Sequence, residues 1–302
     1  MKRLLLIYNA SAGRQKVKAM LPDILDVFAR EGYLTTVVPT QARGDAVRAA
    51  AALGAGFDRV VCCGGDGTLN ETVSGMMQVY DAMRPVLGYI PTGTTNDFSR
   101  NLSLPRGTEN LAKTACGGVP RAIDLGRAGE SWFTYVAAFG LFTDVSYNTP
   151  QNVKNLLGHT AYLIEGASRL TSVQSYAMRV ECDQRVVEGE FIYGMVGNTV
   201  SVGGLLNLPQ ELVKLDDGMF EVLLVRKPKN ALEFQAIVRT LLAMEINKEE
   251  QEDSLVVGFS ANQVTFTCEN AVPWTLDGEF GGEHTTLRIE NHRQNLVLAC
   301  GK

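Results

Sequence analysis

Short apolar runs alternate with amphipathic stretches through the first part of the chain. Runs of about four to eight apolar residues predict buried strands, and apolar residues recurring every three to four positions predict helices. Continuous apolar strands separated by helices indicate a parallel sheet covered on both faces, with the default binding crevice at the carboxyl ends of the strands. The predicted strands are Arg3–Tyr8, Tyr33–Pro39, Arg59–Cys63 and Pro85–Ile90, and the predicted helices are Lys16–Glu31, Asp45–Leu53 and Thr68–Tyr80.

The pattern changes near residue 123, where strand-like segments begin to follow one another. These segments alternate between apolar and polar residues and are broken by turn residues, which is typical of antiparallel sheets. We therefore expect an α/β domain over residues 1–122, joined by a returning final strand within 293–302, and a β-rich domain over residues 123–292. The predicted strands of this part are Trp132–Ala138, Ala177–Cys182, Phe191–Gly197, Met219–Val225, Gln263–Thr267, Thr285–Ile289 and Leu296–Cys300, with helices at Lys154–Leu170 and Ala231–Met244.

The segment Gly64–Glu71 reads Gly-Gly-Asp-Gly-Thr-Leu-Asn-Glu and directly follows a predicted strand. Its glycines allow backbone amides to approach a large anion, and the helix predicted from Thr68 directs the positive end of its dipole to the same place. Asp66 stands where a phosphate would lie, so a cation, a proton or amide donors must offset the repulsion. This arrangement indicates phosphoryl transfer.

Further loops follow other predicted strands. Asn9–Gly13 is either a nucleotide-binding turn or an ordinary turn capped by Asn9 or Ser11. Thr40 follows the second strand and carries a weaker signal. Pro91–Asp97 places hydroxyls, a glycine and an Asn-Asp pair at the same crevice. These residues also suit an N-terminal cap for a short helix, because capping donors and phosphate-binding donors are the same amides.

Two acidic turns occur in the second part of the chain. Asp216 and Asp217 precede Gly218, and carboxylates with backbone carbonyls can bind Mg²⁺, although these residues alone favour a simple turn. Asp277 and Glu279 flank Gly278, and in an extended segment both side chains would project to one face. Such a pair suits a general base for an alcohol, and a solvated turn is the equal alternative.

Composition narrows the choice of function. The net charge of -5 disfavours an electrostatic nucleic-acid binder, and six scattered cysteines without a Cys-x-x-Cys pair predict reduced thiols in a cytosol. No apolar run approaches the roughly 18 residues needed to span a bilayer, so we expect any membrane contact to be peripheral. The sequence lacks the Gly-x-x-x-x-Gly-Lys-Ser/Thr pattern of P-loop enzymes.

Taken in order along nearly the whole chain, these motifs resemble the diacylglycerol kinase catalytic-domain family, in its soluble bacterial branch. NAD kinases and phosphofructokinases share the Gly-Gly-Asp-Gly loop, whereas Pro91–Asp97 together with Asp277–Glu279 is typical of the lipid kinases. The resemblance implies an α/β domain with a parallel sheet of the phosphofructokinase and NAD kinase type. It also implies an antiparallel, sandwich-like β-rich domain, with catalysis in the cleft between the two.

The resemblance also implies roles for single residues. Asp66 would act in catalysis, and Asp277 or Glu279 would be the base, with Glu279 slightly favoured for its longer reach. A structural Mg²⁺ would bind Lys214 and Met219 by carbonyls and Asp217 by its side chain, and Asp124 would connect to the catalytic Mg²⁺. ATP would be held by Asn9, Ala10, Ser11, Ala12, Gly13, Thr40, Gly64, Gly65, Asp66, Gly67, Thr68, Leu69, Asn70, Thr94, Asn96 and Asp97.

The sequence thus predicts an ATP- and Mg²⁺-dependent lipid kinase that converts diacylglycerol to phosphatidic acid in the cytoplasm, at the inner face of the membrane. The alternatives are an NAD kinase or other soluble-alcohol kinase, and a non-catalytic nucleotide- or lipid-binding protein. Ser146 stands where sphingosine kinases carry an acid, which disfavours sphingosine, and Val153–Leu163 is a candidate membrane-contacting segment. A homodimer is one option for the oligomeric state.

Overall fold

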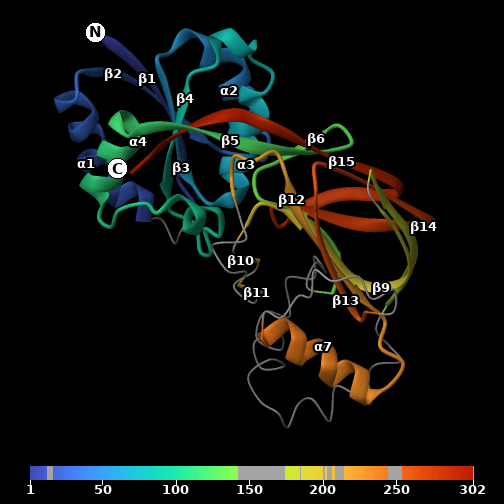
Figure 1. Ribbon diagram of the computed structural model, residues 1–302. Coiled ribbons are helices and arrows are strands. Elements are labelled where there is room, and N and C mark those ends of the chain that lie inside the picture. The colour runs from blue at the N-terminus through green and yellow to red at the C-terminus, as the bar shows by residue number, and fades with distance from the viewer. Residues whose placement is uncertain are drawn as a thin grey trace. The chain divides into compact units, whose positions relative to one another are not determined.

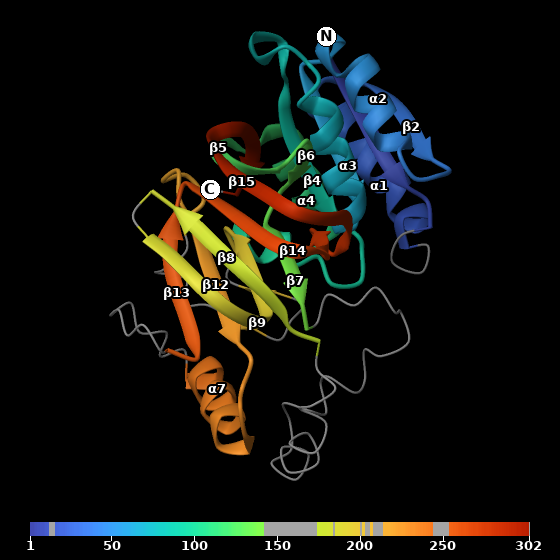
Figure 2. The ribbon, with the colours of Figure 1, turned by 90° about the vertical axis from the view of Figure 1, so that its right-hand side faces the viewer.

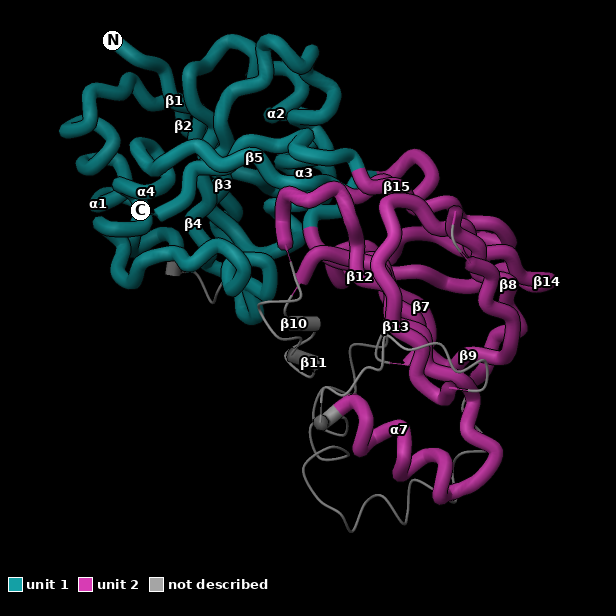
Figure 3. The backbone as a smooth tube through the Cα atoms, viewed as in Figure 1, with its two compact units in different colours: residues 1–125, 132–134, 292–302 teal, residues 126–131, 135–291 magenta. Residues whose placement is uncertain are grey.

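A computed structural model describes residues 1–11, 16–141, 174–183, 185–199, 201–202, 206–207, 214–243 and 254–301. The chain divides into two compact units (Figure 3). Unit 1 comprises residues 1–125, 132–134 and 292–302, and unit 2 comprises residues 126–131 and 135–291. Strands β5 (Val119–Ala128) and β15 (Glu279–Cys300) contribute residues to both units.

Unit 1 is built on strands that pair in parallel (Figure 1). The order is β2-β1-β3-β4, and Leu298 of β15 pairs in parallel with Leu87 of β4. Their bounds are β1 Lys2–Asn9, β2 Tyr33–Thr40, β3 Arg59–Gly64 and β4 Val86–Pro91. Every residue of β3 is buried, as expected for a central strand covered on both faces.

Helices cover this sheet and fix which side chains belong to which face. Helices α1 (Lys16–Arg30) and α4 (Thr108–Gly117) pack on one face, where their apolar residues join Leu4, Val61 and Ile90 in one core cluster. Helix α3 (Asp66–Met76) lies against the other face and packs on α2 (Asp45–Leu53), where Gly75 lies too close to Val47 for any side chain. A short 3-10 helix, Phe98–Leu102, follows β4.

Unit 2 is β-rich and antiparallel (Figure 2). Its strands run in the order β13-β12-β9-β7-β14-β15, and β8 pairs with both β9 and β14. One described helix, α7 (Ala231–Ala243), joins β12 to the segment before β13. The strand bounds are β7 Val136–Gly140, β8 Tyr176–Cys182, β9 Arg185–Gly197, β12 Phe220–Arg226, β13 Val256–Ala261 and β14 Gln263–Leu276, with a small pair of β10 Ser201–Val202 and β11 Leu206–Asn207.

Several elements differ from those predicted. Helix α3 begins at Asp66 and ends at Met76, whereas Thr68–Tyr80 was expected, so Asp66 lies in the first turn of the helix. The predicted strand Trp132–Ala138 is two strands, β6 (Ser131–Phe133) and β7, which pair with different neighbours. Helix α4 and strands β5 and β13 were not predicted. The predicted helix Lys154–Leu170 lies outside the described residues, as do Ser146 and Val153–Leu163.

In the described part of the chain, no helix combines the length and the apolar character needed to cross a membrane. All six cysteines are free thiols. Burial raises the pKa of the Cys63 thiol to about 12 and that of Cys116 to about 11. These two thiols are therefore protonated, and poor nucleophiles, at neutral pH.

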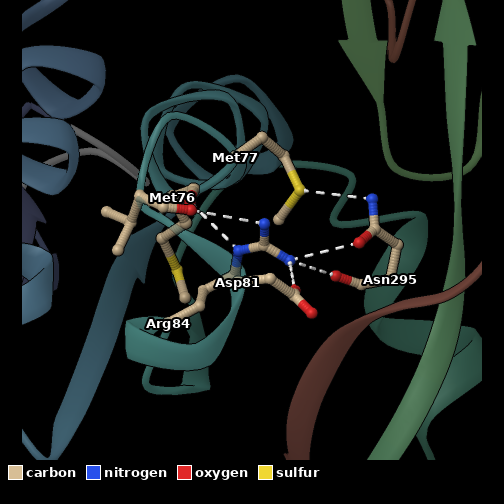
Figure 4. A network of polar contacts seen from close by, with 6 residues as sticks. Met76, Met77, Asp81, Arg84 and Asn295 are labelled. Atoms are coloured by element: carbon tan, nitrogen blue, oxygen red, sulfur yellow. Dashed lines mark hydrogen bonds and ion pairs between the residues drawn. The ribbon is translucent and has the colours of Figure 1, made fainter.

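Arg84 anchors the final strand to the end of α3 (Figure 4). Its side chain is only 11% exposed and pairs with Asp81 at 2.8 Å. Its guanidinium donates to the carbonyl oxygens of Met76 at 3.1 Å and Asn295 at 2.8 Å, and the Asn295 amide in turn reaches the Met77 sulfur. One planar cation thus satisfies a helix end and a returning strand at once.

We expect Arg84→Met to lower the free energy of unfolding by about 1–3 kcal/mol, because it keeps the apolar stem but leaves these carbonyls without their donor. Urea unfolding of purified protein measures the change. Arg48→Met is the matched control, since Arg48 is 70% exposed and pairs only at the surface. Equal stabilities of the two variants would show that the Arg84 network does not stabilise unit 1.

Candidate functional site

The loops that follow the strands of unit 1 lie together at one edge of the sheet, as parallel strands require. The Thr92 amide donates to the Gly64 carbonyl at 2.9 Å, which joins the loops after β3 and β4. The Asn9 side-chain amide donates to the Thr68 hydroxyl at 3.4 Å, and the Thr40 hydroxyl donates to the Tyr8 carbonyl at 3.4 Å. The four predicted loops therefore form one contiguous set.

Asp66 is the first residue of α3 and is held from the neighbouring loop. Its Oδ2 atom accepts the backbone N–H of Asp97 at 3.1 Å and the hydroxyl of Thr95 at 3.4 Å. The preceding residue, Gly65, caps the helix without a side-chain hydrogen bond. The helix dipole and these donors stabilise a carboxylate at this position, and a cation beside Asp66 stays a prediction.

Three of the glycines are needed for close packing: Gly64 packs against Thr68 of its own segment, and Gly65 and Gly93 pack against each other across the two loops. A Cβ atom on Gly64 would lie 2.5 Å from the Thr68 Cβ atom. A Cβ atom on Gly93 would lie 2.6 Å from the Gly65 Cα atom, and one on Gly65 would lie 3.1 Å from the Gly93 Cα atom. The backbones of the two loops thus cross at Gly65 and Gly93, too close for a side chain at Gly93 and with a tight contact for one at Gly65.

We expect Gly93→Ala to destabilise unit 1 by about 1–3 kcal/mol, because the new methyl group meets backbone and must push the loops apart. Separation of the loops also moves Asp97 away from Asp66, so nucleotide binding should weaken as well. Thermal unfolding with and without ADP measures both effects. Gly117→Ala is the control, since nothing lies within 4 Å of a Cβ atom there, and comparable losses in both variants would contradict the crossing.

The loop after β4 is held by its own side chains. Asn96 has a φ of 49° and bonds Gly93 twice, accepting from its N–H and donating to its carbonyl, each at 2.8 Å. Asn96 therefore builds the turn, and its predicted contact with the nucleotide stays a prediction. Asp97 is 3% exposed and lies 3.8 Å from the Arg100 guanidinium, whereas Thr94 is exposed.

The other predicted nucleotide ligands fall into three groups. Leu69 is fully buried in the core, so only its backbone could contact a ligand. Asn70 donates its side-chain amide to the Trp132 carbonyl at 3.0 Å, which is a contact within unit 1. Ala10 and Ser11 lie at the described edge of the first loop, where the Ser11 amide donates to Asn9, and Ala12 and Gly13 lie outside the described residues.

Oxygen donors at this edge suit a hard cation. Asp66 and Asp97 supply two carboxylates in adjoining loops, which matches the one or two that Mg²⁺ usually takes from protein before adding water and substrate phosphates. Asp124 is 2% exposed, and its Oδ1 atom accepts the Gln294 amide at 2.8 Å. Among the described residues, no group of three or more acidic, histidine or cysteine side chains could hold a metal, so these three acids do not form a complete cage.

Asp277 and Glu279 of unit 2 lie in a hairpin turn between β14 and β15, where Leu276 pairs with Glu279. Asp277 has a φ of 51° and Gly278 a φ of 83°, so the turn has the two left-handed residues of a tight hairpin. The extended segment that would have placed both acids on one face is therefore not formed. Asp277 is 3% exposed, and Glu279 is exposed.

The Asp277 carboxylate is bound to backbone in unit 2. Its Oδ1 atom accepts the amides of Tyr135 at 2.9 Å and Val136 at 3.2 Å, and its own amide donates to the Val136 carbonyl at 2.8 Å. The turn is thus fixed to the start of β7. Of the two candidate bases, Glu279 is the one with an exposed side chain.

In the acidic turn before β12, one carboxylate accepts a hydrogen bond from the backbone of the same turn. Asp217 Oδ1 accepts the Met219 amide at 3.0 Å, which is a local turn of the kind that aspartate favours. Lys214 and Asp217 are exposed. The proposed structural Mg²⁺ at Lys214, Asp217 and Met219 therefore stays a prediction.

Three residues in or next to the motifs have contacts that the sequence interpretation missed. Thr95 contacts Asp66, and Arg100 contacts Asp97. The sequence points to them only by their position, within Pro91–Asp97 for Thr95 and just after it for Arg100. Glu71 accepts the amides of Gly44 at 2.8 Å and Ala46 at 3.3 Å, so it caps helix α2 from α3. No local pattern could have shown this cap, because its two partners lie 27 and 25 residues earlier.

Comparison with known proteins agrees with this geometry. Residues 3–128 match the model of the diacylglycerol kinase catalytic domain. The chain is 37% identical over 287 residues to a diacylglycerol kinase of Bacillus subtilis, covering 93% of this chain and 91% of the relative. It is 34% identical over 294 residues to a diacylglycerol kinase of Staphylococcus epidermidis, covering 96% of this chain and 90% of the relative.

Solved structures show the same likeness. A crystal structure described as a candidate diacylglycerol kinase from Bacillus anthracis superposes with a TM-score of 0.79 at 26% identity, covering 99% of this chain and 95% of that one. The sequence similarity extends over nearly the full length of this chain and of both relatives. On this evidence, the chain belongs to the diacylglycerol kinase family of lipid kinases.

Proposed function

We propose that this protein transfers the γ-phosphate of ATP to the free hydroxyl of diacylglycerol, giving phosphatidic acid and ADP. The observation that carries the proposal is the Asp66 carboxylate, fixed at the start of α3 by Asp97 and Thr95 beside the crossing glycine loops. Residues 1–122 with 293–302 would bind the nucleotide, in a sheet related to those of NAD kinases and phosphofructokinases. Residues 123–292 would bind the lipid.

In unit 1, the backbone amides around Gly64–Thr68 and the exposed Thr94 would contact the phosphates of ATP. Asp66 and Asp97 would hold Mg²⁺, which when bound offsets negative charge on the transferring phosphoryl group. Asp124 would stabilise this arrangement indirectly, since its carboxylate holds the backbone at Gln294. Asn9 and Thr40 border the same set of loops.

In unit 2, Glu279 would accept the proton of the lipid hydroxyl. The hydroxyl oxygen of the lipid forms a bond to the γ-phosphorus while the bond from that phosphorus to ADP breaks. Asp277 would serve as a positioning residue, because both amides that its Oδ1 atom accepts belong to the framework of unit 2. A second Mg²⁺ at Lys214, Asp217 and Met219 would stabilise the turn before β12. We also propose that the enzyme works on lipid at a membrane surface, in the cytoplasm, and as a homodimer.

Purified protein incubated with radiolabelled ATP, Mg²⁺ and dispersed diacylglycerol tests this proposal. We expect label to enter the organic phase as phosphatidic acid on thin-layer plates, and more of it on anionic vesicles than on neutral ones. Parallel reactions offer NAD and glycerol as acceptors. Label that enters only the aqueous phase would overturn the lipid assignment in favour of a soluble-alcohol kinase.

A further inference from the structure

Tyr89 places a phenol in the interior of unit 1, within strand β4. Its ring is among the largest fully buried side chains of the protein, and the residue is 1% exposed. Its hydroxyl oxygen is buried and has no hydrogen-bond partner among the residues that the structure describes. A phenylalanine would fill the same volume without burying a hydroxyl.

An unpartnered buried hydroxyl is a rare and destabilising feature. Nearly all buried polar side chains in native proteins are hydrogen-bonded, and those that are not call for an explanation such as a functional role. The neighbours Leu87 and Ile90 in the same strand are apolar and fully buried, so their side chains offer the hydroxyl no hydrogen-bond partner.

The register of the strands places Tyr89 below α3. Tyr89 pairs with Cys62 across β3 and β4, two residues before the pair of Gly64 with Pro91 at the strand ends. Residues that pair in register share a face of the sheet. The Cys62 thiol lies within hydrogen-bonding range of Thr72 in α3, so this face is the one that α3 covers.

Asp66, at the first turn of α3, is the charge that acts most on this phenol. Burial raises the pKa of Tyr89 far above its ordinary value, and the charge of Asp66 raises it further. A neutral phenol can donate a hydrogen bond and a carboxylate can accept one.

We propose that Tyr89 is a positioning residue for Asp66: when nucleotide and cation are bound, its hydroxyl donates through one water to the Asp66 carboxylate and orients that carboxylate toward the cation. This inference rests on the proposed kinase function and extends it by one residue. If the inference holds, the Tyr89 hydroxyl lowers the stability of the ligand-free protein. The same hydroxyl also strengthens the binding of the cation. A residue needed only for packing would do neither.

Tyr89→Phe tests the proposal, with Tyr33→Phe as the matched control. Tyr33 belongs to the same sheet but lies at the amino end of β2, where its hydroxyl donates to the Cys116 carbonyl at 2.9 Å. The measurements are the melting temperature without ligand, and the Mg²⁺ concentration that gives half of the stabilisation produced by saturating ADP. Phosphorylation of diacylglycerol as a function of Mg²⁺ is measured in parallel.

For Tyr89→Phe we expect the melting temperature to rise by about 2–4 °C and the half-saturating Mg²⁺ concentration to rise by about threefold to tenfold. For Tyr33→Phe we expect a lower melting temperature and an unchanged Mg²⁺ dependence. If wild-type protein is active on lipid and Tyr89→Phe has an unchanged Mg²⁺ dependence, the inference about Tyr89 is overturned and the proposed function stands. Wild-type protein that phosphorylates no lipid would overturn the proposed function, and the inference with it.

Discussion

Replacing Asp66 with asparagine is expected to lower kcat for lipid phosphorylation by about 10³-fold while leaving the fold intact. Asparagine keeps the shape of the side chain and an oxygen that can accept the Asp97 amide and the Thr95 hydroxyl. It lacks the negative charge that would hold Mg²⁺ against the phosphates. The loss should therefore fall on the chemical step and on Mg²⁺ dependence, and the melting temperature should change little.

Asp45→Asn is the matched control for this prediction. Asp45 is the first residue of α2, as Asp66 is of α3, and its Oδ2 atom also accepts backbone amides, those of Gln41 at 2.7 Å and Ala42 at 2.8 Å. These donors lower the pKa of its carboxyl group, as expected of a structural acid at a helix start. We expect activity within about twofold of wild type for Asp45→Asn. A similar loss in both variants would show that Asp66 supports only the helix.

The alternation of apolar runs and amphipathic stretches was sufficient to locate strands β1 to β4 and helices α1 to α3 of unit 1. Helix α2 has the predicted bounds Asp45–Leu53, and strand β1 differs by one residue at each end. Helix α2 is readable because burial of one face imposes a regular period, and β1 is readable because burial on both faces requires a continuous apolar run. Helix α4 was missed because only Ala112, Ala115 and Cys116 are buried in it, and such small residues give a weak period.

The candidate site was predicted in its location and not in its internal contacts. Because the carboxyl ends of parallel strands meet at one edge, the loops could be grouped before any coordinates. The glycines were interpreted as serving a ligand, whereas Gly64 and Gly93 are already required by Thr68 and Gly65. The demand on Gly93 depends on the approach of a loop 28 residues away in sequence, which no local pattern records.

The acidic turn of unit 2 illustrates the same limit. Asp277 and Glu279 were paired on the assumption of an extended segment, in which alternate residues share a face. The Asp-Gly dipeptide instead forms a two-residue hairpin turn, which is a known preference of that pair. The separation of the two acids into one buried and one exposed residue follows from that turn.

The buried acid of this turn gives the largest expected effect on stability. Asp277→Ala should lower the free energy of unfolding by about 2–5 kcal/mol, because it removes the acceptor of two buried amides, those of Tyr135 and Val136. Alanine also tolerates the φ of 51° less well than aspartate does. Asp277→Asn should cost about 1 kcal/mol or less, since its side-chain oxygen can accept both amides and asparagine favours this conformation.

Urea unfolding and the lipid assay, applied together to Asp277→Asn and Glu279→Gln, separate structure from catalysis. If Glu279 is the base, Asp277→Asn keeps most of the activity, whereas Glu279→Gln loses it without loss of stability, because Glu279 is exposed. If Asp277 is the base, Asp277→Asn is a stable and inactive protein. The buried carboxylate then both holds the turn and takes the proton, and the assignment of Glu279 is wrong.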